Sequence, residues 1–251
     1  MYIKNLRHER ILAMLQSLRQ MTVTELTTRL GVSSVTIRKD LSFLEENGLV
    51  VRSHGAARLA QDIVSIPSVS SRKSKHFEKK NLIASRALDF IHDGDTVCLD
   101  AGSTNVLLAE KLFDLNIRVA TNSLQVVNTL AESPTVSIIM IGGSFRKEAG
   151  SFIGPISTGA LSTLQFDIAC VGTTGITPHG EFLAQNVIEG EVKRSILKSA
   201  KRRIILSDSS KFNASAFTKF AQADLVDILI TDSDFPAAAE FARLGIEVLC
   251  V

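Results

Sequence analysis

The stretch SSVTIRKDLSFLEENG, residues Ser33–Gly48, predicts an amphipathic helix. Ile37, Leu41 and Leu44 are spaced by four and three residues, which places them along one side of a helix. The opposite arc is polar and cationic apart from one valine, and it holds Val35, Arg38, Lys39 and Ser42. Such side chains reach phosphates and base edges in a DNA major groove, but a solvated surface helix shows the same pattern. The neighbouring sequence has to decide between the two.

A second helix and a tight turn precede this stretch. Thr22 and Glu25 have the spacing of a capping box, which predicts a short helix over residues 25–30. Gly31 then begins a three-residue turn, and two helices joined in this way form a helix-turn-helix. Apolar spacing predicts a further helix over residues 5–17.

A β-hairpin is expected after the amphipathic helix. Residues 49–55, LVVRSHG, are an apolar, β-branched run that ends in a glycine turn, and residues 56–59 supply a second run. Beside a helix-turn-helix such a hairpin is the wing of a winged helix. Arg52, His54 and Arg58 can then contact the DNA backbone or the minor groove. The sequence therefore predicts a winged helix-turn-helix DNA-binding domain in residues 1–60.

Charge is divided unequally along the chain. The net charge is +2, but residues 1–80 sum to +7 and residues 81–251 to −5. A basic segment on an acidic body favours a polyanion such as DNA as the partner of the first part alone.

Composition indicates an ordinary globular protein. The 251 residues are 45% hydrophobic and 22% charged, enough for a small domain plus a medium one. No apolar run approaches the roughly 18 residues of a membrane span, and charges interrupt the first twenty residues, so neither a span nor a signal peptide is expected. The three cysteines and five histidines lack metal-ligand spacing. The sequence predicts a cytoplasmic protein without a metal site.

Short strands and helices alternate after residue 75. Strands are expected at residues 96–99, 117–120, 136–141, 168–171, 204–206, 228–230 and 247–250. Helices are expected at residues 77–91, 106–113, 124–131, 156–164, 189–200 and 237–244. This alternation predicts an α/β domain with a mostly parallel sheet over residues 75–251. Residues 61–74, which are rich in serine, are expected to be a linker.

Polar turns follow five of the predicted strands, at residues 100–105, 121–123, 142–147, 172–175 and 208–211. Ligands of parallel sheets bind at these strand ends. Gly102, Ser103 and Thr104 offer backbone and hydroxyl donors at a helix start, where an anion is favoured. Arg146 and Lys147 can clamp a phosphate or a carboxylate. Each turn alone is explained by helix capping, but together they favour a small, phosphorylated, polyhydroxy ligand.

Specific motifs extend along nearly the whole chain. The first part holds Arg10-Ile11-Leu12, Thr24-Glu25-Leu26, Val32-Ser33-x-x-Thr36-Ile37-Arg38-Lys39-Asp40-Leu41, Leu44-Glu45, Gly48 and Arg52-x-x-Gly55. The body holds Asp100-x-Gly102-Ser103-Thr104, Thr121-Asn122, Gly142-Gly143-x-x-Arg146, Ser151-x-x-Gly154-Pro155, Phe166-Asp167, Gly172-x-x-Gly175, Asn186-x-x-Glu189, Lys193 and Asp208-Ser209-Ser210-Lys211-Phe212. In this combination the chain resembles the DeoR family of bacterial transcriptional regulators. The resemblance implies a body similar in fold to ribose-5-phosphate isomerase, with a sugar phosphate or related metabolite as effector.

Two sets of site residues are expected. Those expected to contact DNA are Thr22, Thr24, Ser33, Ser34, Thr36, Arg38, Lys39, Ser42, Arg52 and His54. Those expected to surround the effector are Asp100, Gly102, Ser103, Thr104, Thr121, Asn122, Gly142, Gly143, Arg146, Lys147, Gly172, Thr173, Thr174, Glu189, Lys193, Asp208 and Lys211. The chain departs from the family pattern at Ala56, where a second wing glycine is usual, and at Thr174, where aspartate is usual. The change at Thr174 removes a carboxylate that can bind sugar hydroxyls or act as a base.

The sequence thus predicts a sequence-specific repressor of a sugar or polyol utilisation operon. Its partners are double-stranded operator DNA and a phosphorylated sugar or polyol effector, and it needs no cofactor. A single winged helix binds only a half-site, so a homo-oligomer, a dimer or a tetramer, is expected.

Two alternatives stay open. The first part can instead be a three-helix module that binds another protein. The whole chain can instead be a sugar-phosphate isomerase-like enzyme with an appended DNA-binding domain. An isomerase needs a base, and Asp100, Glu189 and Asp208 are available carboxylates, but the sequence marks none as catalytic. Fold similarity to an enzyme is only an analogy.

Overall fold

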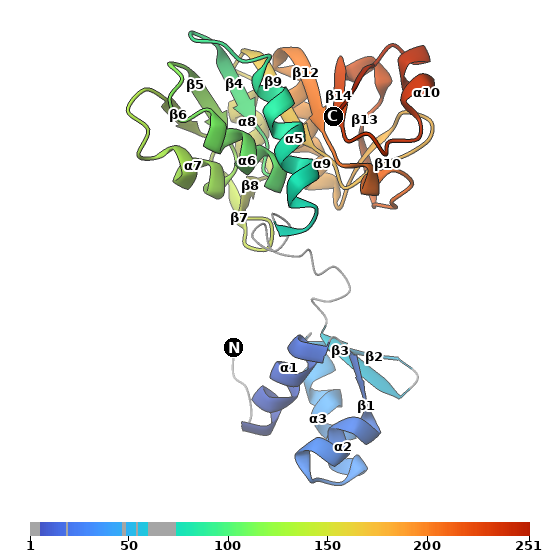
Figure 1. The fold of residues 1–251 in the computed structure, drawn as a ribbon. Coiled ribbons are helices and arrows are strands. Elements are labelled where there is room, and N and C mark those ends of the chain that lie inside the picture. Colours follow the sequence, from blue (N-terminus) through green and yellow to red (C-terminus); the bar gives the residue numbers. More distant parts are fainter. Residues whose placement is uncertain (1–5, 19, 47–48, 54, 60–73) are drawn as a thin grey trace. The chain divides into compact units, whose positions relative to one another are not determined.

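The computed structural model describes residues 6–18, 20–46, 49–53, 55–59 and 74–251. The chain divides into two compact units, residues 1–66 and 67–251, and each is described by itself (Figure 1). Residues 61–73 of the expected linker lie outside the described residues, as does Gly48 at the expected end of the amphipathic helix.

The described part of the N-terminal unit folds as a winged helix-turn-helix. Its elements are α1 (Leu6–Leu18), β1 (Gln20–Thr22), α2 (Val23–Leu30), α3 (Ser34–Glu46), β2 (Val50–Ser53) and β3 (Ala56–Leu59). The strands form an antiparallel sheet in the order β1-β3-β2. Gly31 ends α2 at a φ of 65°, in the left-handed region that glycine enters without strain. The sequence did not indicate β1, because three residues carry no period.

The apolar stripe of α3 packs into the core of this unit. Ile37, Leu41 and Leu44 are fully buried. They join residues of α1, α2 and the sheet in one cluster with Ile11, Leu15, Met21, Leu26, Val50 and Ala57. Full burial of an aliphatic side chain of this size stabilises the fold by about 1.5–3 kcal/mol. The opposite arc of α3 therefore faces solvent.

A buried carboxylate fixes α3 against α1. Asp40 accepts hydrogen bonds from Arg7 Nε at 2.5 Å and Nη2 at 3.0 Å, and its Oδ1 lies 2.9 Å from His8 Nε2. Burial by itself raises the pKa of Asp40, but the hydrogen bonds of Arg7 and His8 hold it below its ordinary value. The His8 ring also stacks on Phe43 of α3, with ring centroids 5.0 Å apart. These contacts fix the orientation of α3 within the unit.

A seven-stranded parallel sheet forms the centre of the C-terminal unit. Its strands are β4 (Thr96–Leu99), β5 (Arg118–Thr121), β6 (Ser137–Met140), β9 (Phe166–Gly172), β12 (Ala200–Leu206), β14 (Ile228–Thr231) and β15 (Glu247–Cys250). They lie in the order β15-β14-β12-β9-β4-β5-β6, and all neighbours are parallel. Each overlaps one of the strands expected from the sequence, and the predicted α/β fold class is confirmed.

Helices cover both faces of this sheet. One face packs against α5 (Phe77–Leu88), α6 (Ser103–Lys111) and α7 (Leu124–Leu130), and Figure 1 shows α5 and α6 in front of the strands. The other packs against α8 (Pro155–Leu161), α9 (Val187–Lys198) and α10 (Ala238–Arg243). Along β9, Ile168 and Cys170 enter the first core, while Ala169 and Val171 enter the second. Because both faces of the sheet are covered, the buried segments of its central strands are apolar, for example residues 97–99 and 204–206.

Several short elements were not expected from the sequence. The hairpin of β7 (Ser144–Arg146) and β8 (Ser151–Ile153) follows β6. A small antiparallel sheet contains β10 (Gly175–Ile176), β11 (Phe182–Ala184) and β13 (Thr218–Ala221), and two single-turn helices are η2 (Ser209–Lys211) and η3 (Ala223–Leu225). Segments this short carry no recognisable period. Among the helices of the described residues, none has both the length and the apolar character to cross a membrane.

Candidate functional sites

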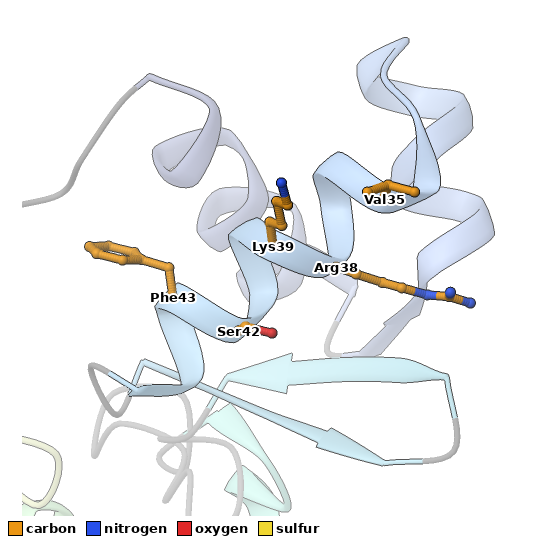
Figure 2. A pocket seen from close by; sticks show the side chains of 5 residues that line it. All are labelled: Val35, Arg38, Lys39, Ser42 and Phe43. Atoms are coloured by element: carbon orange, nitrogen blue, oxygen red, sulfur yellow. The ribbon is translucent and has the colours of Figure 1, made fainter.

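The outward face of α3 forms an open hollow. Figure 2 shows the five side chains that line it, Val35, Arg38, Lys39, Ser42 and Phe43. Arg38 and Lys39 are exposed and extend from the helix, and Val35 is 60% exposed. Two cations, a hydroxyl and apolar groups on one helix face match the donors and contacts that a major groove accepts.

The N-terminus of α3 is capped by Ser33. Its Oγ lies 2.9 Å from Thr36 Oγ1 and accepts a hydrogen bond from the Thr36 backbone N–H at 3.3 Å. Ser34, the other candidate cap, is exposed as the first residue of the helix. Backbone N–H groups and hydroxyls at such a terminus can meet a phosphate.

The predicted capping box at the start of α2 is present. Thr22 Oγ1 accepts from the Glu25 backbone N–H at 3.2 Å, and Glu25 Oε2 accepts from the Thr22 N–H at 2.7 Å. The Thr22 hydroxyl also donates to Glu25 Oε2 at 2.8 Å. Thr22 therefore has a structural role, while Thr24 in the same turn is exposed.

Arg52 of the wing is bound to α3. Its Nε lies 2.9 Å from Glu45 Oε2, and its Nη1 donates to Ser42 Oγ at 2.9 Å. Its backbone N–H donates to Glu45 Oε1 at 3.1 Å. We call the contacts of Arg52 with Glu45 and Ser42 the wing clamp. The sequence predicted Arg52 as a DNA contact only, whereas here it joins β2 to α3; His54, predicted beside it, lies outside the described residues.

Two buried charges meet at the carboxyl end of the parallel sheet. Asp100 directly follows β4, and its carboxylate contacts the ammonium of Lys193 from α9. Both side chains are buried, with 3% and 4% exposed. Gly172 at the end of β9 completes the arrangement, because its N–H donates to Asp100 at 3.3 Å and its carbonyl accepts from Lys193 at 3.0 Å. Burial raises the pKa of Asp100, and the charge of Lys193 opposes that rise.

A second ion pair adjoins the first. Arg146 of β7 contacts the carboxylate of Glu189, and its Nη2 donates to Gln185 Oε1 at 3.3 Å. The other oxygen of Glu189 lies 3.7 Å from Lys193 Nζ. The predicted effector residues Asp100, Lys193, Glu189 and Arg146 thus form one continuous chain of charges, which we call the charge chain.

Thr121 and Asn122 use their side-chain polar atoms within the protein. Thr121 Oγ1 donates to the Leu99 carbonyl at 2.6 Å and accepts from the Ser123 N–H at 3.0 Å. Asn122 Oδ1 accepts from the Ala101 N–H at 3.0 Å, and Nδ2 donates to the Phe152 carbonyl at 3.1 Å. These bonds hold the turn after β4 against β8, so both residues position the loops of the site.

The turn Asp100–Asn105 leads into α6 as expected. Gly102 is its N-cap, and Ser103 and Thr104 follow as buried residues of the first turn. Asn105, absent from the predicted set, donates from Nδ2 to the carbonyls of Asp100 at 2.9 Å and Cys170 at 3.0 Å. Its buried Oδ1 has no hydrogen-bond partner within the described part of the chain. The sequence signal that could have identified Asn105 is its position as the last polar residue of this turn.

Close packing explains the second of the two glycines after β6, Gly143. The Gly142 carbonyl accepts from Ser157 Oγ at 2.7 Å. Gly143 has a φ of 148°, and a Cβ there would lie 2.3 Å from the same hydroxyl oxygen and 2.7 Å from the Ile153 carbonyl oxygen. Any larger residue would push the β7–β8 hairpin away from α8, and that hairpin carries Arg146.

The remaining predicted effector residues are bonded elsewhere or exposed. Thr173 Oγ1 bonds the carbonyls of Gly175 and Leu183 at 2.7 and 3.0 Å, and the Thr174 N–H donates to the Leu183 carbonyl at 2.9 Å. Asp208 caps η2, with Lys211 at the end of the same turn, and Lys147 is exposed. Within the described residues, no hydrogen bond or ion pair joins these side chains to the charge chain.

The same part of the chain contains no cluster of three or more His, Cys, Asp or Glu residues that could hold a metal ion.

Family models match both units. Residues 7–62 match the DeoR-like helix-turn-helix domain, and residues 75–233 match the DeoR C terminal sensor domain. The HTH-type transcriptional repressor GlcR of Bacillus subtilis (strain 168) is 36% identical over 90% of this chain and 88% of its own length. The glycerol-3-phosphate regulon repressor of Escherichia coli (strain K12) is 32% identical over 92% of both chains.

Among solved structures, ribose-5-phosphate isomerase A of Methanocaldococcus jannaschii aligns with a TM-score of 0.41 and 16% identity, covering 55% of each chain. The two family models together span most of both units. The chain therefore belongs to the DeoR family of bacterial transcriptional regulators.

Proposed function

We propose that this protein represses a sugar or polyol utilisation operon by binding its operator, and that a phosphorylated sugar or polyol controls this binding. The observation that carries the proposal is the exposed, cationic face of α3; the opposite face of the helix is buried in the core of the N-terminal unit. The two relatives described above are named repressors, which supports the direction of control.

The α3 face contains groups for both kinds of DNA contact. Arg38 and Lys39 can bind a guanine edge or phosphates, and the hydroxyls of Ser33 and Ser34 lie at the helix start, near the backbone of a docked duplex. Val35 is an exposed aliphatic group between these polar residues and suits the methyl group of thymine. The alternative, a protein-binding module, gains no support from a face with two adjacent exposed cations.

The effector is assigned to the strand ends around the charge chain. Arg146 and Lys193 supply cations, the N-terminus of α6 supplies backbone donors, and an anion is stabilised there. Effector binding then shifts the population between conformers of different operator affinity. We place the DNA-binding domain in residues 1–60, a linker in 61–74 and the sensor in 75–251, acting in the bacterial cytoplasm as a dimer or tetramer on paired half-sites.

We also infer that the protein is not an enzyme. The relatives are named regulators. Of the carboxylates that could act as a base, Asp100 is paired with Lys193 and Glu189 with Arg146. Both carboxylates are therefore already engaged by cations of the protein itself.

Replacing Glu45 by alanine is expected to weaken operator binding by about two- to fivefold, because Arg52 then loses its ion pair with α3 and keeps only its weaker hydrogen bonds to that helix. Removing a negative charge near DNA would by itself strengthen binding, so the sign of the change identifies the wing clamp. Titration of an operator duplex selected from a random pool measures it. Glu25→Ala is unsuitable as a control because Glu25 caps α2, whereas the exposed Glu78→Ala in the other unit is suitable. Equal or tighter operator binding by Glu45→Ala would contradict a role of the wing clamp in DNA binding.

The double variant Ser103→Ala, Arg146→Ala is expected to bind the operator like the wild type and to lose its response to the effector. The two changes remove an α6 hydroxyl and a cation of the charge chain. A panel of phosphorylated sugars and polyols, each with its unphosphorylated counterpart, is screened by thermal shift; a ligand at 100 times its Kd stabilises the folded state by about 2.7 kcal/mol. Operator release by the compound found in this way would persist in the double variant if the effector bound elsewhere.

A further inference from the structure

We infer that Glu189 is a resident anion of the effector site, which the phosphate group of the effector has to displace from Arg146. The inference rests on the proposed function, because it concerns the same site. It reverses the part that the sequence suggested for Glu189. There Glu189 was expected to bind the effector, whereas the geometry makes it a competitor that lowers effector affinity.

The position of Glu189 supports this role. One carboxylate oxygen contacts Arg146, and the other lies 3.7 Å from Lys193, so the group lies between two cations. Only 15% of the Arg146 side chain and 18% of the Glu189 side chain are exposed. A carboxylate held between an arginine and a lysine occupies the place that a bound phosphate would take. The carboxylate of Glu189 and a phosphate cannot both occupy the position beside the Arg146 nitrogen that Glu189 contacts.

The charges of the site lead to the same conclusion. Asp100 and Glu189 carry two negative charges, and Arg146 and Lys193 carry two positive charges. Ionised, these four groups are neutral together, so an incoming phosphate finds no unbalanced cation among them. Addition of a phosphate of charge near −2 would leave an excess of negative charge in a mostly buried site, which is costly. Displacement of Glu189 towards solvent restores the balance on Arg146.

Of the two carboxylates, Glu189 is the one that can leave. Asp100 is buried, follows a central strand directly, and is bound by the Gly172 N–H as well as by Lys193. Glu189 lies in the first turn of α9, is more exposed, and is held at its backbone by a hydrogen bond from its N–H to Asn186 Oδ1 at 2.9 Å. Its side chain can therefore change rotamer without unwinding the helix.

The test measures binding of inorganic phosphate by calorimetry at constant ionic strength, in the 251-residue protein and three variants. Glu189→Gln is expected to bind phosphate about tenfold more tightly, because Arg146 no longer has a charged partner to exchange. Glu191→Gln is the matched control, since Glu191 is exposed on the same helix and its substitution removes the same charge. Its phosphate affinity should stay within about twofold of the wild type. Adding Arg146→Ala to Glu189→Gln should abolish the gain.

Each outcome decides the inference. Unchanged or weaker phosphate binding by Glu189→Gln overturns the inference. So does a gain in affinity that persists when Arg146 is also removed, or an equal gain in Glu191→Gln. Absence of phosphate binding in both the wild type and Glu189→Gln overturns it as well. Failure of the proposed function is seen separately, as absence of operator binding or of any stabilisation by the sugar phosphate panel. Thermal unfolding without ligand shows whether each variant is folded. If Glu189→Gln is unstable, Glu189→Asp replaces it in the test; its side chain is shorter, and its phosphate affinity should lie between those expected for the wild type and for Glu189→Gln.

Discussion

Replacing Lys193 by methionine is expected to lower the free energy of unfolding of the C-terminal unit by about 3–5 kcal/mol. Methionine keeps an unbranched apolar stem like that of lysine but lacks the terminal ammonium, so it leaves Asp100 buried without its cation. The Gly172 N–H remains as a partner and cannot balance the charge. Urea unfolding followed by far-UV circular dichroism measures the change, with two transitions fitted if the two units unfold separately.

Two variants separate this effect from a general loss of charge. Lys201→Met removes a lysine that is 76% exposed and paired with Asp167, so a loss of at most about 1 kcal/mol is expected. Combining Lys193→Met with Asp100→Asn removes both buried charges and should recover part of the loss. Equal losses from Lys193→Met and Lys201→Met would show that the pair with Asp100 is not buried in solution.

The loss caused by Lys193→Met should also depend on pH. Burial raises the pKa of Asp100 in the folded protein, and removal of Lys193 removes the charge that opposes this rise. A carboxyl with a raised folded pKa binds its proton more readily in the folded state, so folding is favoured as the pH falls through that pKa. The variant should therefore regain stability, relative to the wild type, as the pH is lowered from neutral towards the ordinary pKa of aspartate, about 4.

The sheet could be predicted from the sequence because its central strands are buried on both faces. In the run Ile228–Thr231 three of the four residues are β-branched and three are apolar, and the run is bounded by polar residues. The β7–β8 hairpin could not be predicted, because its strands are three residues long and its position depends on the fit of Gly143 against Ser157 and Ile153. That hairpin carries Arg146, so the pairing of Arg146 with Glu189 was also beyond sequence reasoning.

Residue type and strand-end position indicated candidate site residues, but not what each side chain binds. Asp100 and Asn122 both follow strands and carry polar groups. One meets a lysine from α9, 93 positions away along the chain, and the other bonds two loops together. In the N-terminal unit, Arg38 and Arg52 are both exposed arginines in predicted DNA-contact positions. The clamp with Glu45 distinguishes them, since it engages Arg52 alone.

Arg38→Ala is expected to weaken binding to the selected operator by about 1–3 kcal/mol, or about five- to 150-fold, and to relax preference at one base pair. Arg38 lies at the centre of the α3 face, beside Ser42 and Val35, where a guanidinium can bond a guanine edge with two donors (Figure 2). Competition titrations of the selected duplex and its single-base variants measure both effects.

Arg38→Lys separates base recognition from phosphate contact, because lysine keeps the charge but lacks the planar pair of donors. If Arg38 bonds a base, lysine should recover little of the lost affinity, and the dependence on salt should change little. If Arg38 contacts only a phosphate, lysine should restore binding, and alanine should weaken all duplexes alike while lowering the salt slope by about one. Arg10→Ala, an exposed cation of α1, controls for general charge. Unaltered operator binding by Arg38→Ala would exclude this face of α3 from DNA recognition.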